Sequence, residues 1–483
     1  MLLFLFIILP LLSALVALVL KKHLGAAEKI TIASSALQVI VSLYIVRVVL
    51  QTGSYTFAPV FKIDALAALL LFITPIVGFI SILYNRTYIR EEIAKGVIGV
   101  RRARQSYMLI NLFLLAMFAA IASTNPILTW ISIEATTLST VFLISFYNKP
   151  STIEAAWKYL VINSIGLLLA FLGTMIYLAV ASPLVGTEFV TWEDLVSVSS
   201  RLNPDVIKIA FIFIFIGYGT KLGIAPMHTW RPDAYSKAPI PVVALLSGAL
   251  LNIALLVILR FASITNNVVG VNFSQSIFIF FGVLSLLIAA FSIFKQENYK
   301  RLLAYSSIEH AGIMLLGFGF GGLGVYAGLL HMVYHSFAKS AMFLLSGNIF
   351  LKYSTTKIKK VTGVLRILPQ TGALFIVGFL GLTGLPPFGT FLTKFYILSV
   401  GMQTHPFAAS IIIILLAIIF FGFFKSVSAM LFDEPSEEVV AKEYGLLTLL
   451  PPAILLGLVF YFSIMLPGWI QDLLQSSVKI FTQ

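Results

Sequence analysis

Six ionisable side chains lie well inside apolar stretches of this sequence, where a charge is costly. They are Glu134, Lys221, His331, His335, Lys339 and Lys394. If those stretches cross a bilayer, a charge at its centre costs about 2.5–3.5 kcal/mol even on a lenient insertion scale. Such groups persist where they face protein, water or a partner, and a series of them can pass protons. Lys158, Asp64 and Lys425, near the ends of apolar stretches, are expected instead to be helix-end anchors.

The stretch HMVYHSFAKSAMF places His331, His335 and Lys339 at intervals of four residues. On a helix this spacing puts all three on one face, with about 6 Å between successive groups. One water molecule bridges such a distance, so the three residues form a candidate proton relay. A zinc site is disfavoured because a cationic lysine follows one turn later and no carboxylate lies within the motif. We expect no metal site and no cofactor.

Two of the six charges lie beside interruptions of their apolar stretches. Lys221 is followed by GIAP and HTWRPD, and Lys394 is preceded by LGLTGLPPFGT. Proline removes a helical hydrogen bond and clashes with the preceding turn. Freed backbone at membrane depth is tolerated only against protein or a water-filled cavity. Two broken spans of this kind, five spans apart, predict two related five-helix units around a midplane ion site, as in many ion transporters.

Composition places the whole chain in a membrane. Of its 483 residues, 59% are hydrophobic and 11% are charged, whereas a soluble domain carries roughly a quarter charged residues. The absence of cysteine excludes thiolate-held iron–sulfur clusters, c-type haem attachment and disulfides. The net charge of +13 does not indicate nucleic-acid binding, because the basic residues sit mostly in short loops between apolar runs.

We predict an all-α polytopic membrane protein of about fourteen spans. They begin near residues 2, 30, 64, 106, 126, 157, 208, 240, 273, 302, 323, 370, 407 and 445. The loops after odd-numbered spans hold most of the Lys and Arg, so by the positive-inside rule they are cytoplasmic and both termini lie outside. The acidic loop DEPSEE at 433–438 is an exception, but acids contribute little to that rule. Because the first span lacks a basic leader and precedes Lys21 and Lys22, we expect a retained helix, not a cleaved signal peptide.

The expected organisation has four parts. Residues 1–104 form an N-terminal three-helix segment, and residues 440–483 form the last transmembrane helix. Between them, 105–265 and 270–432 hold spans four to eight and nine to thirteen. In these two five-helix repeats, helices seven and twelve are the broken ones.

Four longer motifs carry a family resemblance. They are GYGTKLGIAPMHTWRPDAYSKAPIPVVALLSG, KRLLAYSSIEHAGIMLLG, HMVYHSFAKSAMFLLSGNI and GLPPFGTFLTKF. These motifs resemble the antiporter-like subunits shared by respiratory complex I, Mrp-type Na⁺/H⁺ antiporters and membrane-bound hydrogenases. The segments IEATTLST, EAAWKYL and SSIEHAG are most similar to the large membrane subunit of hydrogenase 4 and related formate hydrogenlyases. The resemblance covers spans four to thirteen, which is most of the chain.

The resemblance implies fourteen helices in which the two five-helix units are inverted repeats. It also implies that Glu134 pairs with Lys221, that the three residues of span eleven form the central relay, and that Lys394 is the terminal exit-side group. Auxiliary roles are expected for His228, Asn252, Glu309, His310 and Lys158. The implied setting is a prokaryotic plasma membrane, with homologous antiporter-like subunits and a redox module as partners and no nucleic acid.

The sequence departs from many complex I relatives in the eighth span. Those relatives carry a lysine or histidine in a stretch like SGALLNIALLVILR, where this chain has Asn252. Asparagine can hold a water molecule by hydrogen bonds but cannot bind the transported proton itself. We therefore expect either that water carries the proton past this position or that the proton takes another path. The chain also ends soon after the fourteenth span, without the long lateral helix of the most distal complex I subunit.

Three functional classes remain open from the sequence. The favoured class is a proton-translocating, non-redox subunit of a multi-subunit oxidoreductase, driven by a neighbouring redox subunit. Movement of Glu134 toward or away from Lys221 would then switch that lysine between holding and releasing its proton, and the histidines would pass the proton on. The second class is a Na⁺/H⁺ antiporter module. The third, a passive scaffold, is disfavoured by the six internal charges.

Overall fold

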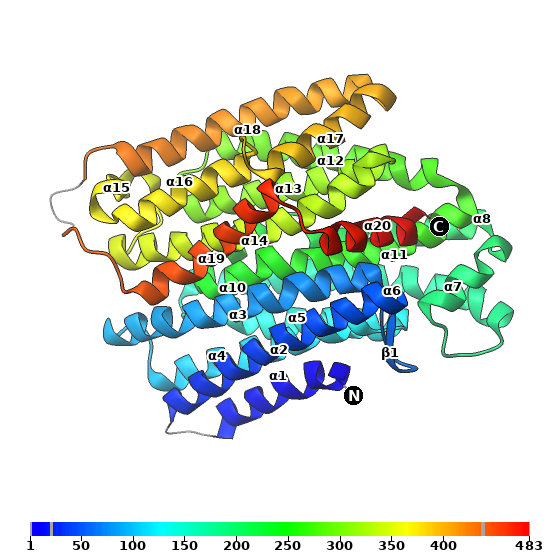
Figure 1. Ribbon diagram of the computed structural model, residues 1–483, viewed down its shortest axis with the longest axis horizontal. Coiled ribbons are helices and arrows are strands. Elements are labelled where there is room, and N and C mark those ends of the chain that lie inside the picture. Colours follow the sequence, from blue (N-terminus) through cyan, green and yellow to red (C-terminus); the bar gives the residue numbers. More distant parts are fainter. Residues whose placement is uncertain (1, 20–22, 436–439, 483) are drawn as a thin grey trace.

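The structure is a computed structural model that describes residues 2–19, 23–435 and 440–482. The basic pair Lys21 and Lys22 and residues 436–438 of the acidic loop 433–438 therefore lie outside the described residues. What is described is almost wholly helical, and its helices run side by side along one long direction (Figure 1).

The first part of the chain forms eleven helices and one hairpin. These are α1 (Leu2–Val19), α2 (Leu24–Thr52), β1 (Tyr55–Ala58), β2 (Phe61–Ile63), α3 (Ala65–Ala94), α4 (Val100–Ala122), α5 (Pro126–Ile144), α6 (Pro150–Val185), α7 (Trp192–Val198), α8 (Pro204–Leu222), α9 (Trp230–Lys237), α10 (Ile240–Leu245) and α11 (Leu251–Val269). A π turn, Leu246–Leu250, joins α10 to α11 without a loop. Single 3₁₀ turns occupy Ser199–Arg201 and Ile358–Lys360.

The remaining chain forms nine helices. These are α12 (Val271–Phe294), α13 (Tyr299–Phe320), α14 (Leu323–Tyr353), α15 (Val364–Ile367), α16 (Pro369–Thr383), α17 (Gly389–Thr404), α18 (Pro406–Phe432), α19 (Leu446–Ile464) and α20 (Gly468–Thr482).

Each of the fourteen predicted spans falls on a helix or on a pair of helices, which confirms the polytopic fold. Several helices begin earlier than predicted, for example α4 at Val100 and α6 at Pro150. The polar turns Arg101–Arg104 and Ser151–Glu154 extend those helices beyond the apolar run, and the apolar pattern alone could not reveal them.

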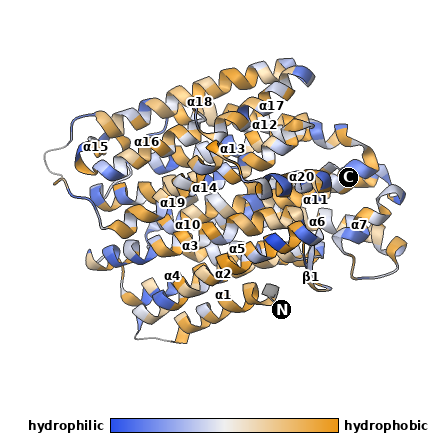
Figure 2. Ribbon diagram, viewed as in Figure 1, coloured by the Kyte–Doolittle hydropathy of each residue, from blue (hydrophilic) through white to orange (hydrophobic). Residues whose placement is uncertain are grey.

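Ten helices of the described chain are long and apolar enough to cross a membrane. The helices α8 and α14 are not among the ten, because the ionisable side chains that they carry make them too charged or too polar. Figure 2 shows that hydrophobic residues cover most of the helix lengths, while hydrophilic residues lie largely toward the two ends of the bundle. Two of the helices that fall outside the ten, α8 and α14, therefore carry candidate residues, whereas α5 and α13 carry candidate residues and are among the ten.

Burial differs sharply between helices, and this difference positions the site. The apolar window of the α10–α11 helix is entirely buried and that of α13 is 94% buried, whereas that of α18 is only 33% buried. In α14 nearly every residue from Gly324 to Ile349 is buried. Polar side chains on α11, α13 and α14 are therefore enclosed by protein and do not face lipid.

Spans seven and twelve are broken, as predicted. In span seven α8 ends at Leu222 and α9 begins at Trp230; in span twelve α16 ends at Thr383 and α17 begins at Gly389. The first half of each span stops at a glycine in the left-handed region, Gly223 with φ 68° and Gly384 with φ 79°. Glycine adopts this conformation without steric cost, so it commonly ends a helix.

Two features were not predicted. The β1–β2 hairpin contains the only strands among residues 2–19, 23–435 and 440–482. The last span also divides into α19 and α20 at 465–467, because Pro467 cannot continue the helix and Gly468 starts the next one. Figure 1 draws both chain ends in the right-hand half of the view, together with β1 and α7.

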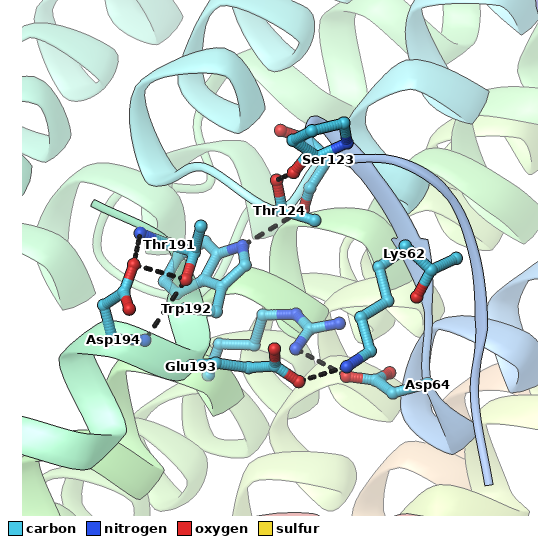
Figure 3. A pocket seen from close by; sticks show the side chains of 11 residues that line it. Lys62, Asp64, Ser123, Thr124, Thr191, Trp192, Glu193 and Asp194 are labelled. Carbon is cyan, nitrogen blue, oxygen red and sulfur yellow. Dashed lines mark hydrogen bonds and ion pairs between the residues drawn. The ribbon is translucent and has the colours of Figure 1, made fainter. Parts of the chain in front are cut away.

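Ion pairs to α7 and α11 fasten the hairpin and the start of α3 around a cavity of about 340 Å³ (Figure 3). Lys62 pairs with Glu193 of α7, and Asp64 pairs with Arg260 of α11 at 2.8 Å. Burial raises the pKa of the Asp64 carboxyl, but the charge of Arg260 and the hydrogen bonds to it outweigh burial and hold that pKa below its usual range. Asp64 therefore stays charged and serves as the N-cap of α3, where Ala67 N donates to it.

Candidate functional site

The first polar cluster links Glu134 of α5 to Lys221 at the end of α8. Lys221 is 1% exposed, and its Nζ donates to the hydroxyls of Thr137 at 2.9 Å and Tyr159 at 2.8 Å. The Thr137 hydroxyl in turn donates to Glu134 Oε2 at 3.4 Å, and Ser164 donates to Oε1 at 3.3 Å. Glu134 is only partly buried, on the outer side of this cluster.

Glu134 and Lys221 are not joined by a direct ion pair in the described structure; Thr137 stands between them. A threonine hydroxyl can accept from the ammonium and donate to the carboxylate at once. Tyr159 continues the series, because Thr140 Oγ1 donates to the Thr136 carbonyl and therefore accepts from the Tyr159 hydroxyl at 2.6 Å. The cluster thus forms a continuous line of hydrogen bonds from a carboxylate to a buried lysine and beyond.

The second polar cluster joins Lys394 of α17 to Glu309 of α13. Lys394 Nζ lies 3.0 Å from Glu309 Oε1, and the two side chains are 10% and 4% exposed. The ammonium also donates to the carbonyl of Thr383 at 3.1 Å, at the end of α16. Glu309, which the sequence placed only among the auxiliary residues, is therefore the direct partner of the predicted exit lysine.

Histidines form a hydrogen-bonded chain beside this ion pair. His310 Nδ1 lies 2.8 Å from His331 Nε2, and His331 Nδ1 lies 2.7 Å from the Thr393 hydroxyl. Since the Thr393 hydroxyl donates to the Thr390 carbonyl, it accepts from His331. The tautomers follow: His331 carries its proton on Nδ1 and accepts at Nε2 from His310 Nδ1–H. His335 completes the group, with its ring centroid 5.0 Å from that of His310.

Several buried polar atoms of this region have no protein partner among the described residues. They are His310 Nε2, both ring nitrogens of His335, Lys339 Nζ and Asn252 Oδ1. Buried polar groups are normally hydrogen-bonded to protein or to ordered water. His335 and Lys339 follow the predicted stripe on α14, and both are fully buried.

Asn252 lies next to the π turn of span eight. Its amide nitrogen donates to Ser336 of α14 at 2.7 Å and to the Gly248 carbonyl at 3.0 Å. Ser340 of α14 donates to the Ala244 carbonyl at 3.1 Å, which satisfies backbone near the irregular turn. π turns within α-helices occur frequently at functional sites, so span eight deviates from a regular helix where α14 approaches it.

Two auxiliary residues lie outside these clusters. Lys158 is half-exposed and pairs with Glu154 at 2.6 Å and with Asp233 at 3.4 Å. It therefore fits the anchor interpretation better than a place in the relay. His228 lies in the break of span seven, 9% exposed, with its ring 6.3 Å from that of Tyr305.

The two clusters are built on matching parts of the two repeats. The dipeptide Ile-Glu recurs as Ile133–Glu134 in α5 and Ile308–Glu309 in α13, and each acid faces a lysine of the broken span in its own repeat. In the first repeat the lysine, Lys221, belongs to the first half of the broken span. In the second repeat the lysine, Lys394, belongs to the second half of the broken span. The domain bounds drawn from the sequence remain a prediction.

Sequence reasoning missed three residues of the site: Thr137, Tyr159 and Arg231. The hydroxyl of Thr137 could have been noticed, because it follows Glu134 by three residues and so shares its helix face. Arg231 stands within the quoted motif HTWRPD, but its burial could not be foreseen: it is 0% exposed. No group of three potential metal ligands occurs in the described parts of the chain.

The fold and these clusters define a class: polytopic membrane subunits with buried acid–lysine pairs on broken helices. The family described as the transmembrane part of NADH:quinone oxidoreductase and Mrp antiporters matches residues 123–420. The chain belongs to this family. A hydrogenase-4 component F homolog from Methylacidiphilum infernorum is 38% identical over 353 residues, which are 72% of this chain and 74% of that protein.

Two solved structures share the whole fold. One is from the membrane-bound sulfane sulfur reductase, an archaeal respiratory membrane complex, with a TM-score of 0.89, 23% identity and coverage of 100% of this chain and 98% of that one. The other is from the Mrp complex of Dietzia sp. DQ12-45-1b, with a TM-score of 0.85, 18% identity and coverage of 99% and 96%. The family resemblance drawn from the motifs is confirmed, and the chain is an integral multi-pass membrane protein of the antiporter-like class.

Proposed function

We propose that this chain is a proton-translocating, non-redox subunit of a multi-subunit membrane oxidoreductase of the membrane-bound hydrogenase or complex I type. The observation that carries the proposal is the series of buried ionisable groups from Glu134 through Lys221, His335 and Lys339 to Lys394. Intramembrane ionisable groups are expensive and usually mark ion pathways. Except for Glu134, which is partly buried, these side chains are enclosed by protein.

The proton path has three parts in this proposal. Glu134, Thr137 and Lys221 form the entry switch, because displacement of the Glu134 carboxylate changes the hydrogen bonds that Thr137 makes and therefore the surroundings of the lysine ammonium. His335 and Lys339, with Asn252 beside them, form the centre, where unpartnered nitrogen and oxygen atoms are suited to bind water. Lys394, Glu309 and the His310–His331 chain form the exit, where hydrogen bonds already connect the histidines to Thr393.

Partners follow from the relatives. The proteins that this chain resembles are described as a hydrogenase component homolog and as members of a sulfane sulfur reductase complex and an Mrp complex. We propose that this chain sits beside homologous membrane subunits and a redox module in a prokaryotic plasma membrane. Purification of the complex and identification of its attached subunits would test this arrangement.

Sodium is the alternative ion, and the Mrp likeness is compatible with it. Sodium needs several oxygen ligands, whereas Glu309 already binds an ammonium and the central groups are nitrogen-rich. We therefore expect turnover-linked pH changes in sealed vesicles to persist at full size in nominally sodium-free buffer. Strict dependence of those changes on added sodium would replace the proposal with the antiporter function.

The orientation in the membrane is also part of the proposal. Basic loops follow odd-numbered spans, which places Lys359 in the cytoplasm and Thr404, the last residue of α17, outside. The chain has no native cysteine, and both positions are exposed. In intact cells, Thr404→Cys should react with a membrane-impermeant thiol reagent, and Lys359→Cys should react only after the membrane is opened. The reverse pattern would invert the topology.

A further inference from the structure

Arg231, in the break of span seven, is a buried cation that the relay described above does not use. It is 0% exposed, and no carboxylate lies within 4 Å of it among the described residues. A guanidinium stays protonated in proteins, so a permanent positive charge sits inside the bundle. Because an unpaired intramembrane charge is costly, a function is the default expectation.

The charge is held by two kinds of contact. Nη2 donates to the carbonyl of Leu222, at the end of α8. The guanidinium also lies 5.6 Å from the ring centroid of Trp230 and 5.7 Å from that of Tyr235, within the range of cation–π attraction. Nε and Nη1 have no partner among the described residues. A Cβ at Gly223 would lie 2.6 Å from the guanidinium, so the glycine leaves room for this contact.

Arg231 occupies the place in the first repeat that Lys394 occupies in the second. Each cation comes from the second half of a broken span and donates to the last carbonyl of the first half: Leu222 for Arg231 and Thr383 for Lys394. Both interactions suit the negative end of a helix. The difference is chemical: a lysine can release its proton, whereas an arginine cannot.

Its location is between the entry cluster and the centre. The carbonyl that it binds belongs to the residue after Lys221, and its charge acts on His335 and Lys339 of α14 and on His228. On the proposed path, a proton that moves from Lys221 toward the histidines crosses the field of this fixed positive charge. In membrane pores an arginine at such a place excludes protons and cations.

We propose that Arg231 is a fixed charge that insulates the Glu134–Lys221 cluster from the central histidines, so that protons do not leak through the relay at rest. Protons then cross only when the driven switch changes the charge near Lys221. This inference rests on the proposed proton path, and it assigns to the first repeat a barrier where the second repeat has an exit.

The test is passive proton leak, measured in liposomes that contain the purified complex, after a pH jump and without turnover. Arg231→Gln should raise the leak on the order of tenfold, the size expected when a unit charge beside a proton path is removed. Arg260→Gln is the matched control: it removes a buried arginine that is paired with Asp64 outside the relay, so its leak should equal that of the wild type.

Arg231→Lys retains a basic side chain that can reach the Leu222 carbonyl. This variant also provides the test if the glutamine variant does not assemble into the complex. At low pH, where even a buried lysine is protonated, its leak should equal that of the wild type. As the pH rises, its leak should increase relative to the wild type, because lysine can lose its charge and arginine cannot. Equal leak from all variants at every pH would overturn the proposal, and so would a lysine variant that leaks at low pH as much as the glutamine variant.

Failure of this inference is separable from failure of the proposed function. Suppose that Lys221→Met abolishes turnover-driven pumping while Arg231→Gln shows the proton leak of the wild type. The proposed relay is then supported and the insulating role of Arg231 is wrong. If neither change has an effect, the proton path itself is wrong.

Discussion

Lys221→Met is expected to reduce turnover-driven proton translocation roughly tenfold or more, since acid–base groups typically contribute about 10²–10⁴-fold to proton-transfer steps. Methionine keeps much of the side-chain length but cannot donate to Thr137 or Tyr159, so the line of hydrogen bonds from Glu134 ends there. The measurement is acidification or alkalinisation inside sealed vesicles during turnover.

The matched control for that variant is Lys208→Met. Lys208 lies on the same helix, but it is exposed and pairs only with Asp205 at 3.1 Å, so pumping should be unchanged. Thr137→Val should give an intermediate loss, because it removes the hydroxyl between the carboxylate and the ammonium and leaves both charges in place. Full pumping by Lys221→Met would eliminate the switch.

Lys394→Met is expected to abolish pumping and, in addition, to lower the stability of the folded protein. It leaves Glu309, 4% exposed, without its ammonium partner, and removal of one member of a buried ion pair costs about 3–5 kcal/mol. The loss of pumping and the loss of stability can be separated, because only the loss of stability depends on the unpaired Glu309 carboxylate.

The double variant Glu309→Gln with Lys394→Met makes that separation. It leaves no buried charge at the pair, so thermal stability of the complex should return toward that of the wild type while pumping stays abolished. Lys425→Met, on the exposed face of α18, is the control for loss of a lysine in the same repeat. Restored pumping in the double variant would assign the pair a purely structural role and move the exit elsewhere.

The sequence by itself determined the membrane fold and most of the candidate site. Span number, the two breaks and the stripe on α14 are local properties: apolar length, proline and glycine, and a four-residue period each act within one helix. The same holds for the six internal charges, because their cost depends only on their place within an apolar run.

The tertiary structure decided which groups meet. Glu309 is the partner of Lys394, Lys221 of α8 bonds to Thr137 of α5, and His310 of α13 bonds to His331 of α14. Each of these contacts joins different helices, and the relative rotation and depth of those helices are set by packing. The burial of Arg231 has the same origin, since its guanidinium reaches the end of α8 only because the chain turns back at Gly223. A hydrophobic pattern specifies which face of a helix is inside, but only packed neighbours specify which atom lies at 3 Å.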